Sequence, residues 1–421
     1  MARNISIDAL RTATVDALRD SLRRQMPAGP LRDYFRSGLD PAWPGHRDFT
    51  RVIGLDQLVR LYAALVAGLV DPPLVAQAAD LLARLAVYQT YEIISDNLGL
   101  GLSGAGSETA AAAGRRRLVR SFNAAMTVRL RGRGRSAAVI LGPERRRAGR
   151  ISTLAQTLAE GTHRGLLDRL AAPPGAVERD VWPALVANME AALDVVATAA
   201  GTPLGAVVRD GLVERYRAVD RTLTARHLPR LELALVGARS ALVVPTVGYT
   251  LAVVADLVDP VPGLADAVAD GDLPDALYDA ALLCRLLNDV GPGLLRLGRD
   301  ARRNAMRRVR AEAGRGDLAA ALTGTRFTRL AKDLTHGEFN VCLYGARRAA
   351  GPAAALAALE SDLDHFAGLY ALHRARLTEA LARLTARLGD PRPATVVDRF
   401  VRFQARLYAN PYQGAAGEYA I

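Results

Sequence analysis

The chain has 421 residues, of which 50% are hydrophobic, 5% aromatic and 23% charged, and its formal net charge is +12. This apolar content excludes a disordered chain and suffices for a large buried core, and the excess of Ala and Leu over β-branched residues favours helices over sheet. We therefore expect an all-α fold.

In chain order, residues 1–50 are polar and rich in proline, which predicts an N-terminal arm with one short helix. Residues 51–421 are predicted to form one helical domain. Its first helix is expected at 56–67, and its second at 71–97, where Pro72 suits the first turn and a glycine-rich turn follows the end.

An Arg-rich insertion at about 114–150 comes next and is predicted to be a solvated, partly mobile loop. Helical periodicity resumes after it. The helices predicted there lie at about 150–171, 177–200, 203–224, 229–243, 247–258, 274–290, 294–314, 316–349, 352–388 and 394–408.

Glu92 and Asp96 stand four residues apart near the end of the second predicted helix, so both carboxylates project from one face. Mg²⁺ prefers such oxygen ligands and keeps waters that substrate phosphates can replace. Two interpretations are open: a metal-binding pair, or two solvated acids at a helix end that the helix dipole disfavours.

Asn288 and Asp289 follow a strongly apolar helix and precede the turn at 291–293. One interpretation is a helix C-terminus with Asn near the cap. The other is an inward amide and carboxylate that contact a metal ion or a diphosphate.

Arg239 interrupts an apolar run, where a charge is almost never buried without a partner. Either it pairs with an acid, or it faces a cavity that receives an anion. Lys332 is the single lysine of the chain. This arginine bias has two open explanations, a genome that favours Arg codons and an affinity for phosphate.

Together these residues resemble the motifs of class I terpene synthases, which have the α-helical terpenoid synthase fold. The family's DDxxD/E motif matches Glu92 and Asp96 at its first and fifth positions, and its NDxxSxxxE motif matches Asn288 and Asp289. Its diphosphate-sensing arginine lies a little under 50 residues before the second motif, which is the position of Arg239.

The resemblance extends over about residues 55–410. Asn340 lies in a segment similar to the family's helix after the second motif. Arg406 and Tyr408 resemble an Arg-Tyr pair near the family's C-terminus.

Three positions depart from the family motifs: Ile93 replaces an aspartate, Pro292 a serine and Arg296 a glutamate. A guanidinium repels a metal ion, so Arg296 is expected to touch the diphosphate directly. In the other interpretation, Asp300 supplies the missing carboxylate.

The resemblance implies a single-domain helical bundle around a central cavity, with Mg²⁺ as cofactor. The implied metal ligands are Glu92, Asp96, Asn288 and Asp289. The implied catalytic residues are Arg239 and Tyr408, and the implied substrate-binding residues are Arg239, Arg296, Arg406 and Asn340. The implied reaction ionises an allylic C15 or C20 prenyl diphosphate, including a bicyclic one, and cyclises or rearranges the carbocation.

Two alternatives remain: a squalene- or phytoene-synthase-like coupling enzyme, which Asn288-Asp289 and the later Arg299-Asp300 resemble, and a non-catalytic helical binding protein. Nucleic acid is not an expected partner, because the Arg runs lack interleaved aromatic residues. A homodimer is left open.

Cys284 and Cys342 form no CxxC pair, and the N-terminus lacks a signal-peptide core, so a cytoplasmic location is expected. The uncharged segment 240–255 is shorter than the roughly 20 residues of a membrane span. Stable membrane insertion is therefore not expected.

Overall fold

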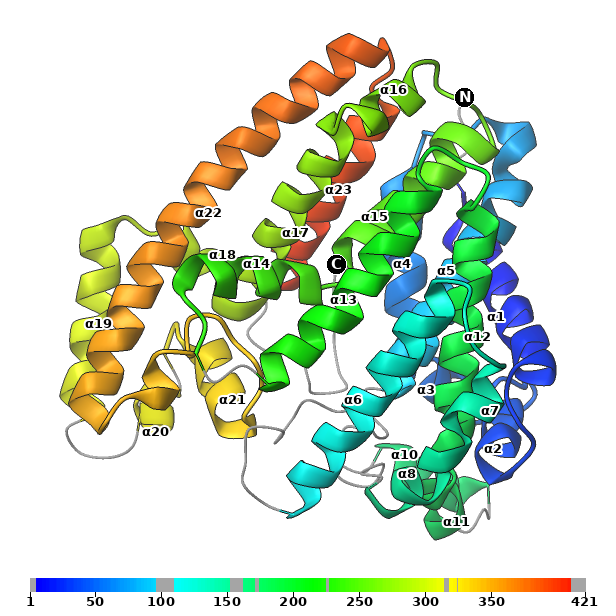
Figure 1. The fold of residues 1–421 in the computed structure, drawn as a ribbon, viewed down its shortest axis with the longest axis horizontal. Helices are drawn as coiled ribbons and strands as arrows, with labels where there is room; N and C mark the ends of the chain where they lie inside the picture. Colours follow the sequence, from blue (N-terminus) through cyan, green and yellow to red (C-terminus); the bar gives the residue numbers. More distant parts are fainter. Residues whose placement is uncertain are drawn as a thin grey trace.

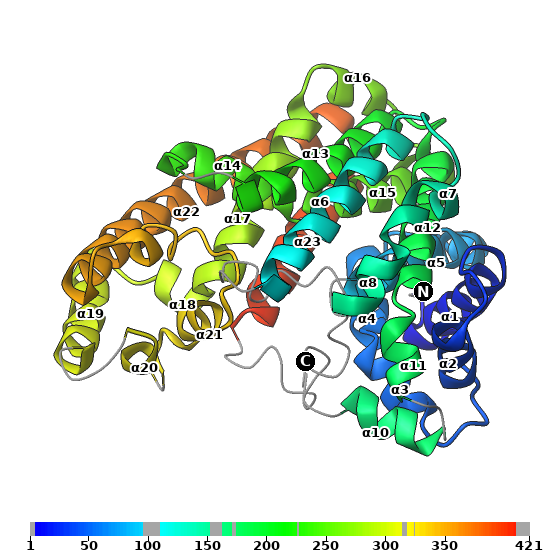
Figure 2. The ribbon, with the colours of Figure 1, turned by 60° about the horizontal axis from the view of Figure 1, so that its bottom comes forward.

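The computed structural model describes residues 5–95, 110–151, 162–170, 174–224, 227–313, 318–323 and 325–409. Across these ranges the regular secondary structure is helical and includes no strand, as the composition predicted. The N-terminal helices lie on one side of the molecule, and α19 and α22 lie on the opposite side (Figures 1 and 2).

The elements of the first half are α1 (Ile7–Arg24), α2 (Pro30–Gly38), α3 (His46–Val52), α4 (Leu55–Val66), η1 (Pro72–Leu74), α5 (Val75–Ser95), α6 (Ala110–Leu130), α7 (Ala137–Leu141), η3 (Gly142–Glu144), α8 (Arg145–Ile151), α10 (Thr162–Arg169), α11 (Pro174–Arg179) and α12 (Trp182–Ala199). Those of the second half are α13 (Gly205–Thr224), α14 (Arg230–Ser240), α15 (Val243–Ala252), η5 (Val253–Leu257), α16 (Leu264–Ala269), α17 (Asp272–Val290), α18 (Pro292–Leu295), α19 (Arg299–Ala313), α20 (Leu318–Leu322), α21 (Thr328–His336), η6 (Ala346–Arg348), α22 (Pro352–Leu388) and α23 (Arg392–Leu407).

The interior of the bundle is occupied by α15, whose ten residues are all buried. It contacts α5, α12, α13, α17 and α23, and one π-helical turn, η5, continues it. A helix that is apolar on every side is stable only when covered on every side. This interior helix lies where the resemblance led us to expect a central cavity.

A sharp bend of 44° separates α14 from the α15–η5 segment. Within the described ranges no single helix is long and apolar enough to cross a membrane, and the bent pair passes that test by length and composition alone.

The last helix, α23, closes the bundle against α4, α15, α17 and α22. Arg399 Nη1 donates to the carbonyl oxygens of Leu65, at 3.0 Å, and Ala67, at 2.7 Å. These carbonyls belong to the end of α4, where a helix leaves acceptors without intrahelical partners. The side chain of α23 thus caps a helix from the opposite end of the sequence.

The N-terminal region differs from the predicted arm with one short helix, because it forms α1, α2 and α3. Leu10, Leu18 and Leu22 recur at helical spacing and are buried where α1 packs on α4 and α5. The Ser6 side chain caps α1 by accepting from the Ala9 N–H at 3.0 Å. The prolines fall between these helices or in a first turn, so they do not disrupt them.

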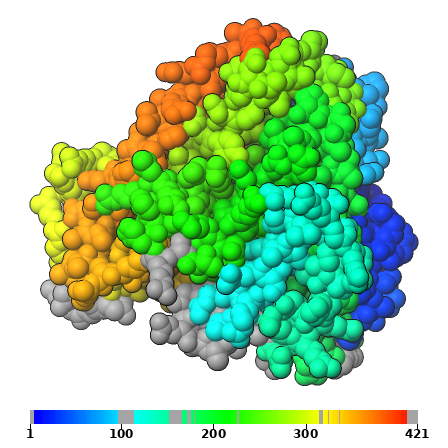
Figure 3. Space-filling model, in the orientation of Figure 1, coloured from blue at the N-terminus to red at the C-terminus, as the bar shows by residue number. Residues whose placement is uncertain are grey.

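The Arg-rich segment was wrongly predicted as a loop. Most of it belongs to α6, which packs along α13, with Leu118, Phe122 and Met126 buried at intervals of four residues. Arginines occupy the other face, where Arg120 Nε lies 3.1 Å from Asp220 Oδ1. Figure 3 shows this part of the chain, in cyan, across the front of the molecule.

The predicted helix at 352–388 is confirmed, since α22 has the same bounds. The predicted helix at 316–349 is wrong, because this stretch divides into α20, α21 and a series of turns. Gly337 ends α21 with φ of 66°, a left-handed conformation that glycine adopts without steric cost.

Candidate functional site

The last turn of α17 carries a buried carboxylate whose two oxygens are both occupied. Asp289 is 0% exposed. Its Oδ2 accepts from Arg285 Nε at 2.9 Å and from the Val341 N–H at 2.8 Å. Its Oδ1 pairs with Arg285 Nη2 and accepts from Asn288 Nδ2 at 3.2 Å. The arginine, one helical turn earlier, therefore compensates the charge of this acid.

Asn340 joins the segment after α21 to the end of α17. Its Nδ2 donates to the main-chain oxygen of Asp289 at 2.8 Å and to Asp333 Oδ2 at 2.7 Å. Its Oδ1 accepts from the Cys342 N–H at 2.9 Å. The amide uses its donors and its acceptor together, as a buried polar group requires.

Arg329, on α21, completes this cluster. Its Nε donates to the Asn288 carbonyl at 2.7 Å and its Nη2 to Asn288 Oδ1 at 3.1 Å. The guanidinium carbon lies 4.7 Å from the centre of the Tyr408 ring, within cation–π distance. Four residues singled out in the sequence, Asn288, Asp289, Asn340 and Tyr408, thus meet at the end of α17; with Arg285, Arg329 and Asp333 we call them the α17 cluster.

Burial controls the protonation of this cluster. It raises the pKa of Asp289 above the usual aspartate value, against the lowering effect of Arg285. Burial, and then the negative charge of Asp289, raises the pKa of Asp333 to about 7. Burial also raises the pKa of Tyr408 to about 12, although Arg329 opposes it. The two acids therefore compete for one set of cations in a poorly solvated space.

Glu92, near the end of α5, belongs to a different buried network. Its Oε1 pairs with Arg215, and its Oε2 accepts from Asn188 Nδ2 at 2.7 Å and from the Tyr216 hydroxyl at 3.0 Å. The hydroxyls of Tyr88 and Tyr216 lie 2.9 Å apart. Both oxygens of this carboxylate are thus engaged inside the protein. Asp96, the other half of the predicted pair, lies outside the described residues.

Arg239 adopts the ion pair that was one of its two interpretations. Its Nε lies 3.4 Å from Glu214 Oε2, which also accepts from the Tyr278 hydroxyl at 2.6 Å. The Arg239 guanidinium carbon lies 6.0 Å from the centre of the Tyr278 ring. Tyr278 precedes Asn288 by nearly three turns of α17, roughly 15 Å along its axis. The structure therefore holds Arg239 away from the α17 cluster.

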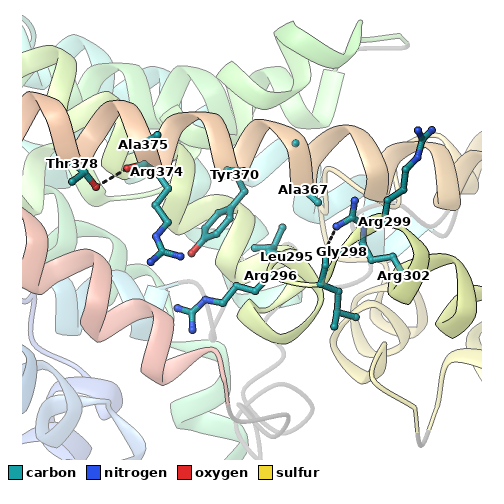
Figure 4. A pocket seen from close by; sticks show the side chains of 13 residues that line it. Leu295, Arg296, Gly298, Arg299, Arg302, Ala367, Tyr370, Arg374, Ala375 and Thr378 are labelled. Atoms are coloured by element: carbon teal, nitrogen blue, oxygen red, sulfur yellow. Dashed lines mark hydrogen bonds between the residues drawn. The ribbon is translucent and has the colours of Figure 1, made fainter.

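The two remaining predicted arginines are exposed. Arg406 lies in the last turn of α23. Arg296 follows α18 and lines a pocket with residues of α22 (Figure 4). Asp300, the other interpretation for the missing carboxylate, is exposed in the first turn of α19.

Mg²⁺ can be tested against these side chains. Within the described ranges, no group of three or more His, Cys, Asp or Glu side chains is arranged to hold a metal ion. Glu92 and Asp289 each share both oxygens with an arginine and with hydrogen-bond donors. In this arrangement the described residues do not fit Mg²⁺, and the metal stays a prediction from the sequence.

The sequence interpretation missed the cations and amide that hold these acids. Arg285 carried a signal, because it precedes Asp289 by four residues and such pairs face each other on a helix. Arg215, Asn188 and Arg329 carried none, because each comes from a different helix far along the chain from the residue it contacts.

Comparison of the chain with protein-family models, with curated proteins and with solved structures found no match. The functional argument therefore depends on the chain's own residues.

Proposed function

We propose that this chain is a class I terpene synthase that ionises an allylic prenyl diphosphate and cyclises or rearranges the resulting carbocation. One observation carries the proposal: Asn288, Asp289, Asn340 and Tyr408 come from three separate segments and meet in the α17 cluster. The resemblance named the same four residues from their sequence positions alone.

The cluster offers the charge that such an ionisation needs. Negative charge develops on the diphosphate as the carbon–oxygen bond breaks, and arranged cations lower the free energy of that transition state. Arg329 is bound to neutral acceptors of Asn288, not to an acid, in the contacts given above. Its charge is therefore less compensated than that of Arg285, which makes it our choice for the diphosphate contact.

The rest of the reaction needs an apolar enclosure, because water quenches a carbocation. The interior around α15 supplies apolar side chains, and Tyr88, Tyr91, Tyr249 and Tyr278 are our choices for cation–π contacts. The substrate remains a proposed C15 or C20 diphosphate. Mg²⁺, when bound, would add charge stabilisation to the leaving diphosphate.

The test is an incubation of the purified full chain with geranyl, farnesyl and geranylgeranyl diphosphates, with Mg²⁺ or with EDTA, followed by gas chromatography. A hydrocarbon or alcohol with the carbon number of its substrate supports the proposal. A product with twice that number would indicate prenyl coupling instead. The EDTA arm decides whether the chemistry needs the metal.

A matched pair of variants links the product to the cluster. Arg329→Gln should lower the rate about a hundredfold, because a transition-state contact is lost. Arg326→Gln removes the same charge three residues earlier, at an exposed position, and should leave the rate within about twofold. Equal rates for both variants would remove Arg329 from the reaction.

A second candidate function is a non-catalytic helical protein. It is favoured by the pairing of Glu92 with Arg215 and of Asp289 with Arg285, because acids compensated in this way also serve folding alone. No product from any diphosphate, together with a stable fold, would favour this candidate.

A further inference from the structure

The residues after α18 and the middle of α22 enclose a pocket of about 580 Å³. This volume lies within the range of small-molecule sites. Figure 4 shows Arg296 below and Arg374 above, with the Tyr370 side chain between them. Apart from Arg296, the residues of this pocket belong to none of the motifs considered above.

The pocket carries a surplus of positive charge. Four arginines line it, namely Arg296, Arg299, Arg302 and Arg374, and none of the described residues that line it is acidic. Asp364 lies beside it and takes up two of these cations, with Oδ2 3.2 Å from Arg299 Nε and Oδ1 3.1 Å from Arg302 Nη2. Two guanidinium groups are left without a compensating acid.

Arg296 and Arg374 are both exposed, and within the described part of the chain neither guanidinium has an ion-pair partner. They come from separate elements, the end of α18 and the middle of α22, so the fold brings two like charges to one pocket. Like charges repel, and an anion placed between them relieves that repulsion. Guanidinium groups also match phosphate oxygens in a bidentate geometry.

The other walls select for more than charge. Tyr370 is 4% exposed, and its hydroxyl points toward the arginine side of the pocket in Figure 4. Leu295 and Ala367 add apolar surface. The combination of two uncompensated arginines, a hydroxyl and an apolar wall suits a phosphate group attached to a small apolar body.

We propose that this pocket binds the phosphate or diphosphate group of a small organic molecule through Arg296, Arg374 and Tyr370. The proposal goes beyond the terpene synthase reaction, because its anion is bound at the surface of α22 and is not cleaved. It stands or falls independently of that reaction.

Isothermal titration calorimetry with the full chain in EDTA tests the proposal. The two probes are inorganic diphosphate and isopentenyl diphosphate, which is not allylic and cannot ionise as an allylic substrate does. Both should bind to one site, and isopentenyl diphosphate should bind more tightly because its carbon chain contacts the apolar wall. No binding of either probe at millimolar concentration would overturn the proposal.

Variants locate the site. Arg374→Gln and Arg296→Gln should each raise the Kd for diphosphate about tenfold or more, since each removes a charge-assisted contact. Arg383→Gln, an exposed change on the same helix, is the matched control and should stay within about twofold. An equal loss in the control would show that diphosphate follows the general positive charge, and the proposal would fail. All three positions are exposed, so the variants should fold, which circular dichroism checks.

Turnover separates this proposal from the proposed function. Inorganic diphosphate binding that depends on Arg374, in a protein that converts no prenyl diphosphate, would support the pocket and contradict the synthase. A synthase whose diphosphate affinity ignores Arg374 would do the reverse.

Discussion

The side chain of Asn340 donates to the main-chain oxygen of Asp289 at 2.8 Å, and this bond fastens the turns after α21 to the last turn of α17. The same amide holds Asp333 and the Cys342 N–H, so one residue satisfies buried groups from three segments. The cluster therefore depends on Asn340 for its shape as much as on the acids for its charge.

Asn340→Ala should destabilise the fold by about 2–4 kcal/mol, because it leaves several buried polar groups without partners. Denaturation with urea measures this change. Asn304→Ala is the control, since Asn304 is exposed on α19, and it should change the free energy of unfolding by less than about 0.5 kcal/mol. A neutral Asn340→Ala would mean that water replaces the amide.

Arg285→Met should cost about 3–5 kcal/mol of stability, because it leaves the Asp289 carboxylate buried without its cation. The double variant Arg285→Met with Asp289→Leu should cost less than the two single changes added together. A double-mutant cycle on urea midpoints measures this difference. Strict additivity would show that the pair does not interact.

The stability of the fold should depend on the protonation of Asp333. Its pKa is raised to about 7 in the folded state, chiefly by burial, so the folded protein binds a proton that the unfolded chain releases near pH 4. The contribution of this group therefore favours the fold below about pH 4 and is lost as the pH rises toward 7, by at most about 1.4 kcal/mol per pH unit.

Asp333→Asn removes this titration while it keeps an acceptor for Asn340. The difference in unfolding free energy between wild type and variant should grow in favour of the variant from pH 4 to pH 7, and then level off. Urea denaturation at a series of pH values measures it. A difference that does not change with pH would show that Asp333 ionises normally in the fold.

Glu92→Ala should destabilise the protein by about 3–5 kcal/mol, because Arg215 and two other hydrogen-bonding partners lose a buried acceptor. Tyr216→Phe removes one of those bonds and should cost about 1 kcal/mol. Measured with product formation, this pair distinguishes two roles for Glu92. Activity lost in a variant that remains folded would point to chemistry, whereas activity that follows the folded fraction would point to structure.

The fold class and most long helices could be predicted, because the apolar periodicity of segments such as α17 and α22 is local. The helix α6 was missed although Leu118, Phe122 and Met126 carried the period, because the charge of the surrounding arginines dominated the interpretation. The turns at 337–349 could not be predicted well, since they are held by Asn340 and other contacts that form only in the folded protein.

For the candidate site, the sequence predicted which polar residues matter near the end of α17 but not what they contact. Asp289 was expected to face a ligand, and instead it accepts from Arg285 and the Val341 N–H. Glu92 was expected beside Asp96 at a helix end, and it contacts Arg215 on another helix. Spacing along one helix cannot specify a partner that tertiary packing brings from elsewhere.

The cap that Arg399 places on the end of α4 also sets a timetable for synthesis on the ribosome. The Leu65 carbonyl waits for a partner 334 residues further along the chain. At roughly 5–20 residues per second, that interval lasts about 15 to 70 s. Throughout it, the surfaces of α4, α15 and α17 that α23 will cover are open to other nascent chains and to chaperones. The last helix to emerge thus decides when this protein stops being a client of the folding machinery.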